Sequence, residues 1–402
     1  KFLGREAQLK ELANLLRQNS LVFISGGGGI GKTELAAQYA ATQADQGKTV
    51  VQMHYMPGSN DLNDDELDCS GIRQLLMNLA ISNFPPPPTP PAPGALQARG
   101  DSVSYLQQRK DYYNWKLDRL RMLCNEHVLL IIDNFNVESD EGLKDLQTIL
   151  NGAQCVITTW CDYSKLGYAQ LQLESSEQDA GWLEQLFRAQ CSNPAKLNNE
   201  VVQVIIRTVE YNTTAVILLG AQMEADWNDE NELLRQLKLG LQQVGEVTVG
   251  FHKDGVDRTD QRAYGYLQAI FNISSLSQKE CHLLGALSFI SSQKFDRDML
   301  LKWIPDVDKV AVNQLVRFRW IEKEDNGKMH LPQVIADVVF DWASGKFASF
   351  LDYLHQLAQW LENLPDDEQY SHLELLKTVA ERFLYCAKEL DTRAEEDVLS
   401  VA

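Results

Sequence analysis

Apolar residues between positions 21 and 165 fall into short runs, and the stretches between them show helical spacing. A continuous apolar run of roughly four to eight residues is typical of a buried strand. The strand candidates, some of them interrupted by polar residues, are 21–25, 49–54, 128–132 and 155–159. Strands that alternate with helices indicate a parallel sheet with crossover helices. The sequence therefore predicts an α/β domain with a parallel sheet over residues 1–172.

A long insert separates the second and third predicted strands. It runs from residue 57 to residue 112 and contains a proline-rich loop at residues 84–94. Proline lacks the backbone N–H donor and favours polyproline II, so this loop cannot enter a sheet. It is either a solvated spacer, which its composition favours, or a docking segment for a partner.

The pattern of the second half is mostly helical. Residues 173–245 have apolar positions at helical spacing, for example at Trp182, Leu183, Leu186 and Phe187, which predicts a helical domain. Two amphipathic helices are also predicted within residues 346–402. Their stripes are Phe350, Leu354, Leu357, Leu361 and Leu364, then Leu373, Leu376, Ala380, Phe383, Ala387 and Leu390. We interpret this helical hairpin as the start of a TPR-like solenoid.

Residues 246–345 combine three predicted helices with a hairpin. The helices cover 277–290, 296–303 and 307–317, and Asn326-Gly327 joins two short strands at 320–325 and 328–331. Asn-Gly strongly favours a tight hairpin turn. This order of elements predicts a winged helix, a module that often binds DNA. The acidic residues Asp306 and Asp308 lie at the start of the third helix, and its arginines stand only at its end. The basic surface that DNA binding requires is therefore weak.

Length and charge narrow the class of protein. A chain of 402 residues exceeds one ordinary core, and a net charge of −19 opposes binding to nucleic acid or anionic lipid. The apolar runs are too short to cross a membrane. Seven irregularly spaced cysteines without a Cys-x-x-Cys pair favour reduced thiols in the cytoplasm over a zinc or redox site. Because residue 1 is a lysine just before a motif, we expect the chain to be part of a longer protein.

The segment Gly26-x-x-x-x-Gly31-Lys32-Thr33 follows the first predicted strand and precedes a helix-like run. It matches the phosphate-binding loop pattern. Glycines let backbone N–H groups surround a polyphosphate, and the helix N-terminus favours its negative charge. We expect Lys32 to reach the terminal phosphates and the Thr33 hydroxyl to bind Mg²⁺. The alternative is a glycine-rich turn without a ligand, and the fit of both flanks argues against it.

The third predicted strand ends in Asp133 and Asn134. Ligands of open α/β folds bind at this carboxyl edge of the sheet, so we expect Asp133 to help hold Mg²⁺ rather than to be an ordinary strand-end residue. Asn134 stands where many hydrolysing ATPases have a second acid. An amide can orient a water molecule but cannot accept its proton, so we expect slow turnover at most.

The fourth predicted strand ends in Trp160. A cation at this edge would sense the terminal phosphate and stabilise its charge, which tryptophan cannot do. Either another residue such as Lys165 takes this part, or the γ-phosphate is weakly sensed.

The order of these motifs resembles the NB-ARC class of STAND ATPases, which includes plant disease-resistance proteins, the animal apoptosome scaffold and many bacterial homologues. The resemblance runs from Phe2 to about Ala343. Residues 2–6 are similar to the opening motif of the family, which implies that Phe2 and Leu3 contact adenine and that Arg5 lies near the nucleotide. The resemblance also implies that the ATP or ADP phosphates are bound by Gly28, Gly29, Ile30, Gly31, Lys32, Thr33 and Glu34.

Residues 329–331, Met-His-Leu, resemble the Met-His-Asp motif of the family. This implies that His330 contacts the β-phosphate of ADP in the closed state, whereas an ordinary hairpin histidine is the alternative. Residues 158–160, Thr-Thr-Trp, align with a Thr-Thr-Arg motif but lack its arginine. Residues 212–215 take the place of a Gly-Leu-Pro-Leu segment and lack its glycine and proline.

The resemblance implies a signal-transduction switch that is off with ADP, on with ATP, and oligomerises on activation. It also implies an N-terminal effector and a C-terminal sensor in the same chain, an unknown trigger ligand, and a use in bacterial NLR-like defence against phage. The alternatives are a transcription regulator whose winged helix binds DNA, a steadily working ATPase motor, and a small-molecule kinase.

Overall fold

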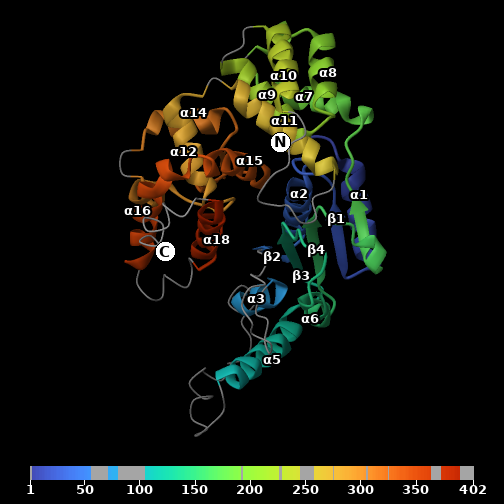
Figure 1. The fold of residues 1–402 in the computed structure, drawn as a ribbon. Helices are drawn as coiled ribbons and strands as arrows, with labels where there is room; N and C mark the ends of the chain where they lie inside the picture. Colours follow the sequence, from blue (N-terminus) through green and yellow to red (C-terminus); the bar gives the residue numbers. More distant parts are fainter. Residues whose placement is uncertain are drawn as a thin grey trace. The chain divides into compact units, whose positions relative to one another are not determined.

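The computed structural model of the chain describes residues 2–55, 71–79, 105–191, 193–225, 229–244, 258–274, 276–304, 307–324, 326–363 and 373–389. These residues form two compact units, 1–174 and 175–402 (Figure 1). The proline-rich loop at 84–94 lies outside the described residues. No helix in the described part of the chain is long and apolar enough to cross a membrane.

A five-stranded parallel sheet forms the centre of the first unit. Its strand order is β2-β3-β4-β1-β5, so β4 lies between β1 and β3. The elements are α1 Glu6–Gln18, β1 Leu21–Ser25, α2 Lys32–Asp45, β2 Thr49–His54, α3 Gly71–Asn78, α5 Tyr105–Leu123, β3 Val128–Asp133, α6 Gly142–Ile149, β4 Gln154–Thr159, η2 Ser164–Leu166 and β5 Ala169–Gln172. The parallel sheet and its first four strands are confirmed, and β5 is a strand that the sequence did not predict.

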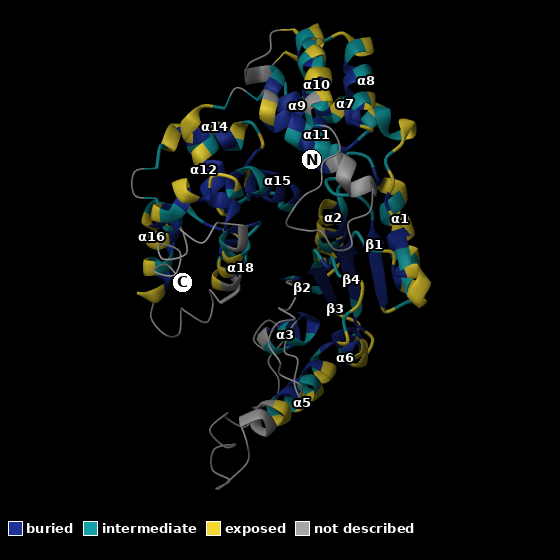
Figure 2. Ribbon diagram, in the orientation of Figure 1, coloured by how far each residue is buried: buried dark blue, intermediate teal, exposed yellow. Residues whose placement is uncertain are grey.

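Helices cover both faces of this sheet, which is why residues 21–24, 128–132 and 155–157 of its central strands are apolar on both faces. Alternate residues of β1 face opposite sides: Val22 packs with α1 and α2, and Phe23 packs with α3, α5 and α6. The strands β1, β3 and β4 are accordingly buried along most of their length (Figure 2). The polar loops at their carboxyl ends are left at one edge of the sheet.

The second unit is mainly helical. Its elements are η3 Glu177–Asp179, α7 Ala180–Ala189, η4 Pro194–Lys196, α8 Asn199–Thr208, α9 Thr213–Ala225, α10 Glu230–Val244, α11 Arg258–Ile273, α12 Gln278–Ser288, α13 Arg297–Trp303, α14 Lys309–Arg317, β6 Glu322–Lys323, β7 Met329–His330, α15 Gln333–Ser344, η6 Phe347–Phe350, α16 Leu351–Glu362 and α18 Leu373–Glu389. The strands β6 and β7 pair in antiparallel fashion, and Gly327 in their connection has a φ of 86°. The assignment of this region to a winged helix, and the other domain bounds, stay predictions.

The last described helix, α18, contributes to the same apolar core as α12 and α15. It buries Leu375, Phe383 and Cys386, and it also buries Arg382. The predicted stripe is therefore partly wrong, because Leu376 and Ala380 are exposed. The buried face is rotated because Arg382 occupies part of it, bonded to the carboxylate of Asp337.

Candidate nucleotide-binding site

The glycine loop leaves β1 at the carboxyl edge of the sheet and ends at the first residue of α2. Gly26, Gly29 and Gly31 have φ values of 147°, 72° and 100°, which L side chains rarely adopt. A Cβ atom on Gly26 would also lie 2.6 Å from the backbone oxygen of Leu173. Among the described residues no side chain caps α2, whose cap residue is Gly31. This end of α2 can therefore offer backbone N–H groups to an anion.

Lys32 closes the loop from its far end. Its Nζ atom donates to the carbonyl oxygens of Gly26 at 2.6 Å and Gly27 at 2.9 Å. These bonds hold the ammonium group against the start of the loop. The positive charge of Lys32 therefore lies beside the backbone of Gly26 and Gly27.

Thr33 and Asp133 meet although 100 residues separate them in the sequence. The Thr33 hydroxyl donates to Oδ1 of Asp133 at 2.8 Å. The Asp133 side chain is 15% exposed, so its carboxylate lies at the surface of the sheet edge rather than beneath it. A hydroxyl and a carboxylate oxygen in contact are ligands that Mg²⁺ accepts together with phosphate oxygens.

Two side chains that the sequence reasoning did not assign to the site contact Asp133. The hydroxyl of the buried Thr158 donates to Oδ1 at 2.5 Å, and Nδ1 of His54 lies 3.9 Å from Oδ2. His54 is the last residue of β2 and pairs with Asp133 in the parallel ladder. The strand-end rule that located Asp133 would have located His54 too, because parallel strands end at one edge.

Asn134 follows Asp133 with a φ of 66°. Its backbone N–H donates to the Thr158 hydroxyl at 2.9 Å, and its side-chain oxygen accepts from Nδ2 of Asn136. Asn136 in turn accepts from the backbone N–H of Trp160 at 3.0 Å. These bonds join the ends of β3 and β4, and they hold the Asn134 amide by its oxygen.

The opening segment, residues 2–6, contacts the chain just after β5. Arg5 is 7% exposed, has a φ of 67°, and donates from Nη1 to the carbonyl oxygen of Glu174 at 2.9 Å. Phe2 packs on the core beneath α1 and α2, Leu3 is half-buried, and Glu34 is exposed on the first turn of α2. Lys165 has a side chain that is 82% exposed and pairs with Asp162 at 3.7 Å. Their proposed roles toward a nucleotide remain predictions.

His330 belongs to the second unit, on β7. Its Nε2 atom lies 3.5 Å from Oε2 of Glu322 on β6, and its side chain is 21% exposed. The contact between His330 and a nucleotide bound to the first unit remains a prediction.

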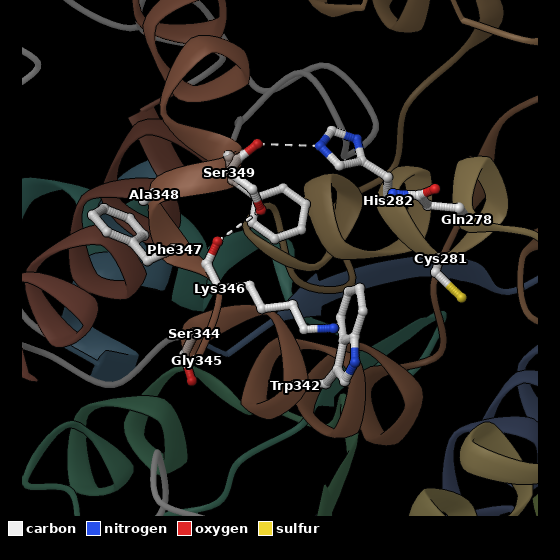
Figure 3. A pocket seen from close by; sticks show the side chains of 11 residues that line it. Gln278, Cys281, His282, Trp342, Ser344, Gly345, Lys346, Phe347, Ala348 and Ser349 are labelled. Carbon is white, nitrogen blue, oxygen red and sulfur yellow. Dashed lines mark hydrogen bonds between the residues drawn. The ribbon is translucent and has the colours of Figure 1, made fainter.

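A shallow pocket in the second unit contains none of the predicted site residues. Lys346 lies over the ring of Trp342 at 4.0 Å, and Nε2 of His282 lies 3.1 Å from the carbonyl oxygen of Ser349 (Figure 3). Among the residues that the structure describes, no group of three or more His, Cys, Asp or Glu side chains is placed to hold a metal ion.

The parallel sheet, the glycine loop at the end of β1 and the Thr33–Asp133 pair at its carboxyl edge define a P-loop NTPase fold. No protein-family model and no curated protein matches the sequence.

Solved structures with a similar fold include a signal transduction ATPase with numerous domains (STAND) protein with a tetratricopeptide repeat sensor from Pyrococcus horikoshii. It shares 14% sequence identity at a TM-score of 0.49, covering 97% of this chain and 53% of that one, so this chain spans about half its length. A Walker-type ATPase of Pyrococcus abyssi shares 13% identity at a TM-score of 0.37, covering 84% and 96% of the two chains. The replication initiator DnaA bound to AMPPCP and single-stranded DNA shares 13% at a TM-score of 0.37, covering 88% and 93%. Likeness at this level does not define what this chain does.

Proposed function

We propose that the chain is a nucleotide-operated switch that binds ADP or ATP with Mg²⁺ at the Gly26–Thr33 loop. The observation that carries this proposal is the 2.8 Å contact between the Thr33 hydroxyl and the Asp133 carboxylate beside that loop. Mg²⁺ is usually held by one or two protein oxygens and by phosphate oxygens, so two such ligands are enough. Mg²⁺ would supply charge neutralisation of the phosphates when bound.

The residues divide the work of holding a polyphosphate. The glycine backbone and the N-terminus of α2 bind phosphate oxygens, and Lys32 exchanges its bonds to Gly26 and Gly27 for bonds to the terminal phosphate. Phe2, Leu3 and Arg5 lie at the start of the same unit and are proposed to contact the base side of the nucleotide. This division follows the resemblance to NB-ARC proteins.

Hydrolysis at this site is proposed to be slow. Asn134 carries an amide where an acid would accept the proton of the attacking water, and its oxygen already accepts from Asn136. Slow hydrolysis keeps the nucleotide bound, which suits a switch. A bound ligand shifts a conformational equilibrium by its preference for one of the two states. In the proposed off state ADP also contacts His330, and exchange for ATP removes that contact.

The wider setting of the switch rests on the family resemblance. We propose that the ATP-bound chain self-associates, that effector and sensor regions of the same protein flank it, and that it acts in the cytoplasm in bacterial defence against phage. Binding of DNA by the hairpin module has less support. Asp308 caps α14 and pairs with Lys279 at 3.5 Å, and Arg319 is bonded to Gln190 at 3.0 Å.

The test is to denature the purified protein and identify the released nucleotide by chromatography. We expect ADP in stoichiometric amount from the wild type and none from Lys32→Ala prepared in parallel. If the wild type releases no nucleotide and also fails to bind added ADP with Mg²⁺, the proposed function is wrong. A gel shift with DNA that persists at moderate salt would instead favour the transcription regulator.

A further inference from the structure

Thr158 on β4 is buried to 1% exposure, yet its hydroxyl contacts two groups at the candidate site. It donates to Oδ1 of Asp133 at 2.5 Å and accepts the backbone N–H of Asn134 at 2.9 Å. A hydroxyl has one proton to donate and two lone pairs to accept with, so both bonds form at once. One buried side chain thus fixes two consecutive residues at the end of β3.

The two bonds have different consequences. The bond to Asp133 is charge-assisted and holds the carboxylate oxygen that also receives the Thr33 hydroxyl. The bond to the Asn134 N–H holds that residue in the left-handed region, at a φ of 66°. Without the Thr158 hydroxyl the carboxylate would be held on this side by Thr33 alone, and it could turn toward His54, whose Nδ1 lies 3.9 Å from Oδ2.

We propose that Thr158 is a positioning residue that keeps the Asp133 carboxylate oriented for Mg²⁺ and so couples Mg²⁺ binding to nucleotide binding. This inference rests on the proposed function. Partners that orient a metal ligand from outside the coordination shell are commonly worth about ten- to a hundredfold in metal affinity. Thr158 acts through Asp133 and is placed to contribute in this range.

The neighbouring residue offers a matched control. Thr159 lies on the same strand, is also fully buried, and accepts the backbone N–H of Cys161 at 3.0 Å through its hydroxyl. Replacing Thr159 by valine removes a buried hydroxyl from the same strand without removing a bond to Asp133. Any general loosening of β4 would therefore show in both valine variants.

The experiment measures the ADP dissociation constant by calorimetry with Mg²⁺ and again in EDTA, and takes the ratio as the Mg²⁺-dependent gain. We expect Thr158→Val to lower this gain about tenfold while the affinity in EDTA stays near that of the wild type. Thr158→Ser, which keeps the hydroxyl, should retain the gain, and so should Thr159→Val. If Thr158→Val does not fold, Thr158→Ala removes the same hydroxyl with a smaller side chain.

A second comparison tests whether Thr158 acts through Asp133. In the Asp133→Asn background the gain is already lost, so adding Thr158→Val should change it no further. An unchanged gain in Thr158→Val, or an equal loss in Thr159→Val, would overturn the assignment to Thr158 and leave the proposed function standing. A wild type that binds ADP neither with Mg²⁺ nor in EDTA would instead overturn the proposed function and this inference with it.

Discussion

The ion pair between Arg382 and Asp337 gives a sharp prediction about the second unit, because both side chains are almost fully buried, at 2% and 0% exposed. Arg382 joins α18 to Asp337 on α15 at 2.5 Å and to Ser291 at 3.1 Å, and it also donates to the carbonyl oxygen of Ser288. Burial lowers the pKa of Arg382, and Asp337 opposes that shift. Arg382→Met would leave the Asp337 carboxylate buried without its cation.

Removing one partner of such a pair costs about 3–5 kcal/mol, whereas replacing both by apolar residues is often near neutral. We therefore expect Arg382→Met to lower the free energy of unfolding by about 3–5 kcal/mol, and Arg382→Met with Asp337→Leu to recover most of that loss. The exposed pair Arg235–Glu232 is the control, with side chains 57% and 39% exposed. Arg235→Met should leave the free energy of unfolding close to that of the wild type, because exposed ion pairs contribute little.

Urea unfolding followed by tryptophan fluorescence measures these differences. Of the eight tryptophans, Trp115 and Trp160 lie in the first unit and the other six in the second, so the signal reports mainly on the second unit. The Asp337→Leu variant is measured as well. If Arg382→Met lowers the free energy of unfolding by less than about 1 kcal/mol, or if the losses of Arg382→Met and Asp337→Leu simply add in the double variant, the ion pair does not join α18 to the core as we infer.

Three further predictions concern the loop, the hairpin histidine and the cysteines. Gly26→Ala should lower the free energy of unfolding by about 1–3 kcal/mol and weaken ADP binding, because the loop backbone must move away from the Leu173 oxygen. Gly181 lies in open space on a helix, so Gly181→Ala should leave the free energy of unfolding unchanged in the same urea titration. Equal losses in the two variants would contradict this prediction. His330→Ala should release a fluorescent ADP analogue about tenfold faster in a stopped-flow chase, and an unchanged rate would refute its contact with ADP. Burial raises the pKa of the Cys124 thiol to about 12. Iodoacetamide at about pH 8 should therefore leave Cys124 unmodified in the folded protein and modify it after unfolding, as measured by mass spectrometry. Labelling of Cys124 in the folded protein would contradict this prediction.

The sequence located four of the five strands of the parallel sheet and missed the short edge strand β5. In β5, Ala169–Gln172, glutamines alternate with apolar residues and only Leu171 is buried. Such a short edge strand lacks the continuous apolar run that marked β1 and β3. On α18 the hydropathy pattern failed for a different reason. It places arginine at the surface, and Arg382 is buried because Asp337, distant in the sequence, neutralises it.

The candidate site shows the same division between local and long-range information. The glycine loop and Asp133 were predicted from local patterns, because each carries its own spacing and flanks. Thr158 was noticed only as part of a family motif, and its bond to Asp133 depends on how β3 and β4 are paired. The bond between Asn134 and Asn136 lies beside the left-handed backbone at Asn134, and no periodicity in the sequence reveals either feature.

The central claim is that the Gly26–Thr33 loop binds a nucleotide through Lys32 and the Thr33–Asp133 pair. Calorimetric titration of nucleotide-free protein with ADP in the presence of Mg²⁺ tests it most directly, with Lys10→Ala as a control for an exposed lysine of the same unit. We predict tight binding by the wild type and by Lys10→Ala, and a loss of at least about a hundredfold in Lys32→Ala, since a charged hydrogen-bond donor to phosphate is removed. Equal affinity of Lys32→Ala and the wild type would contradict the account.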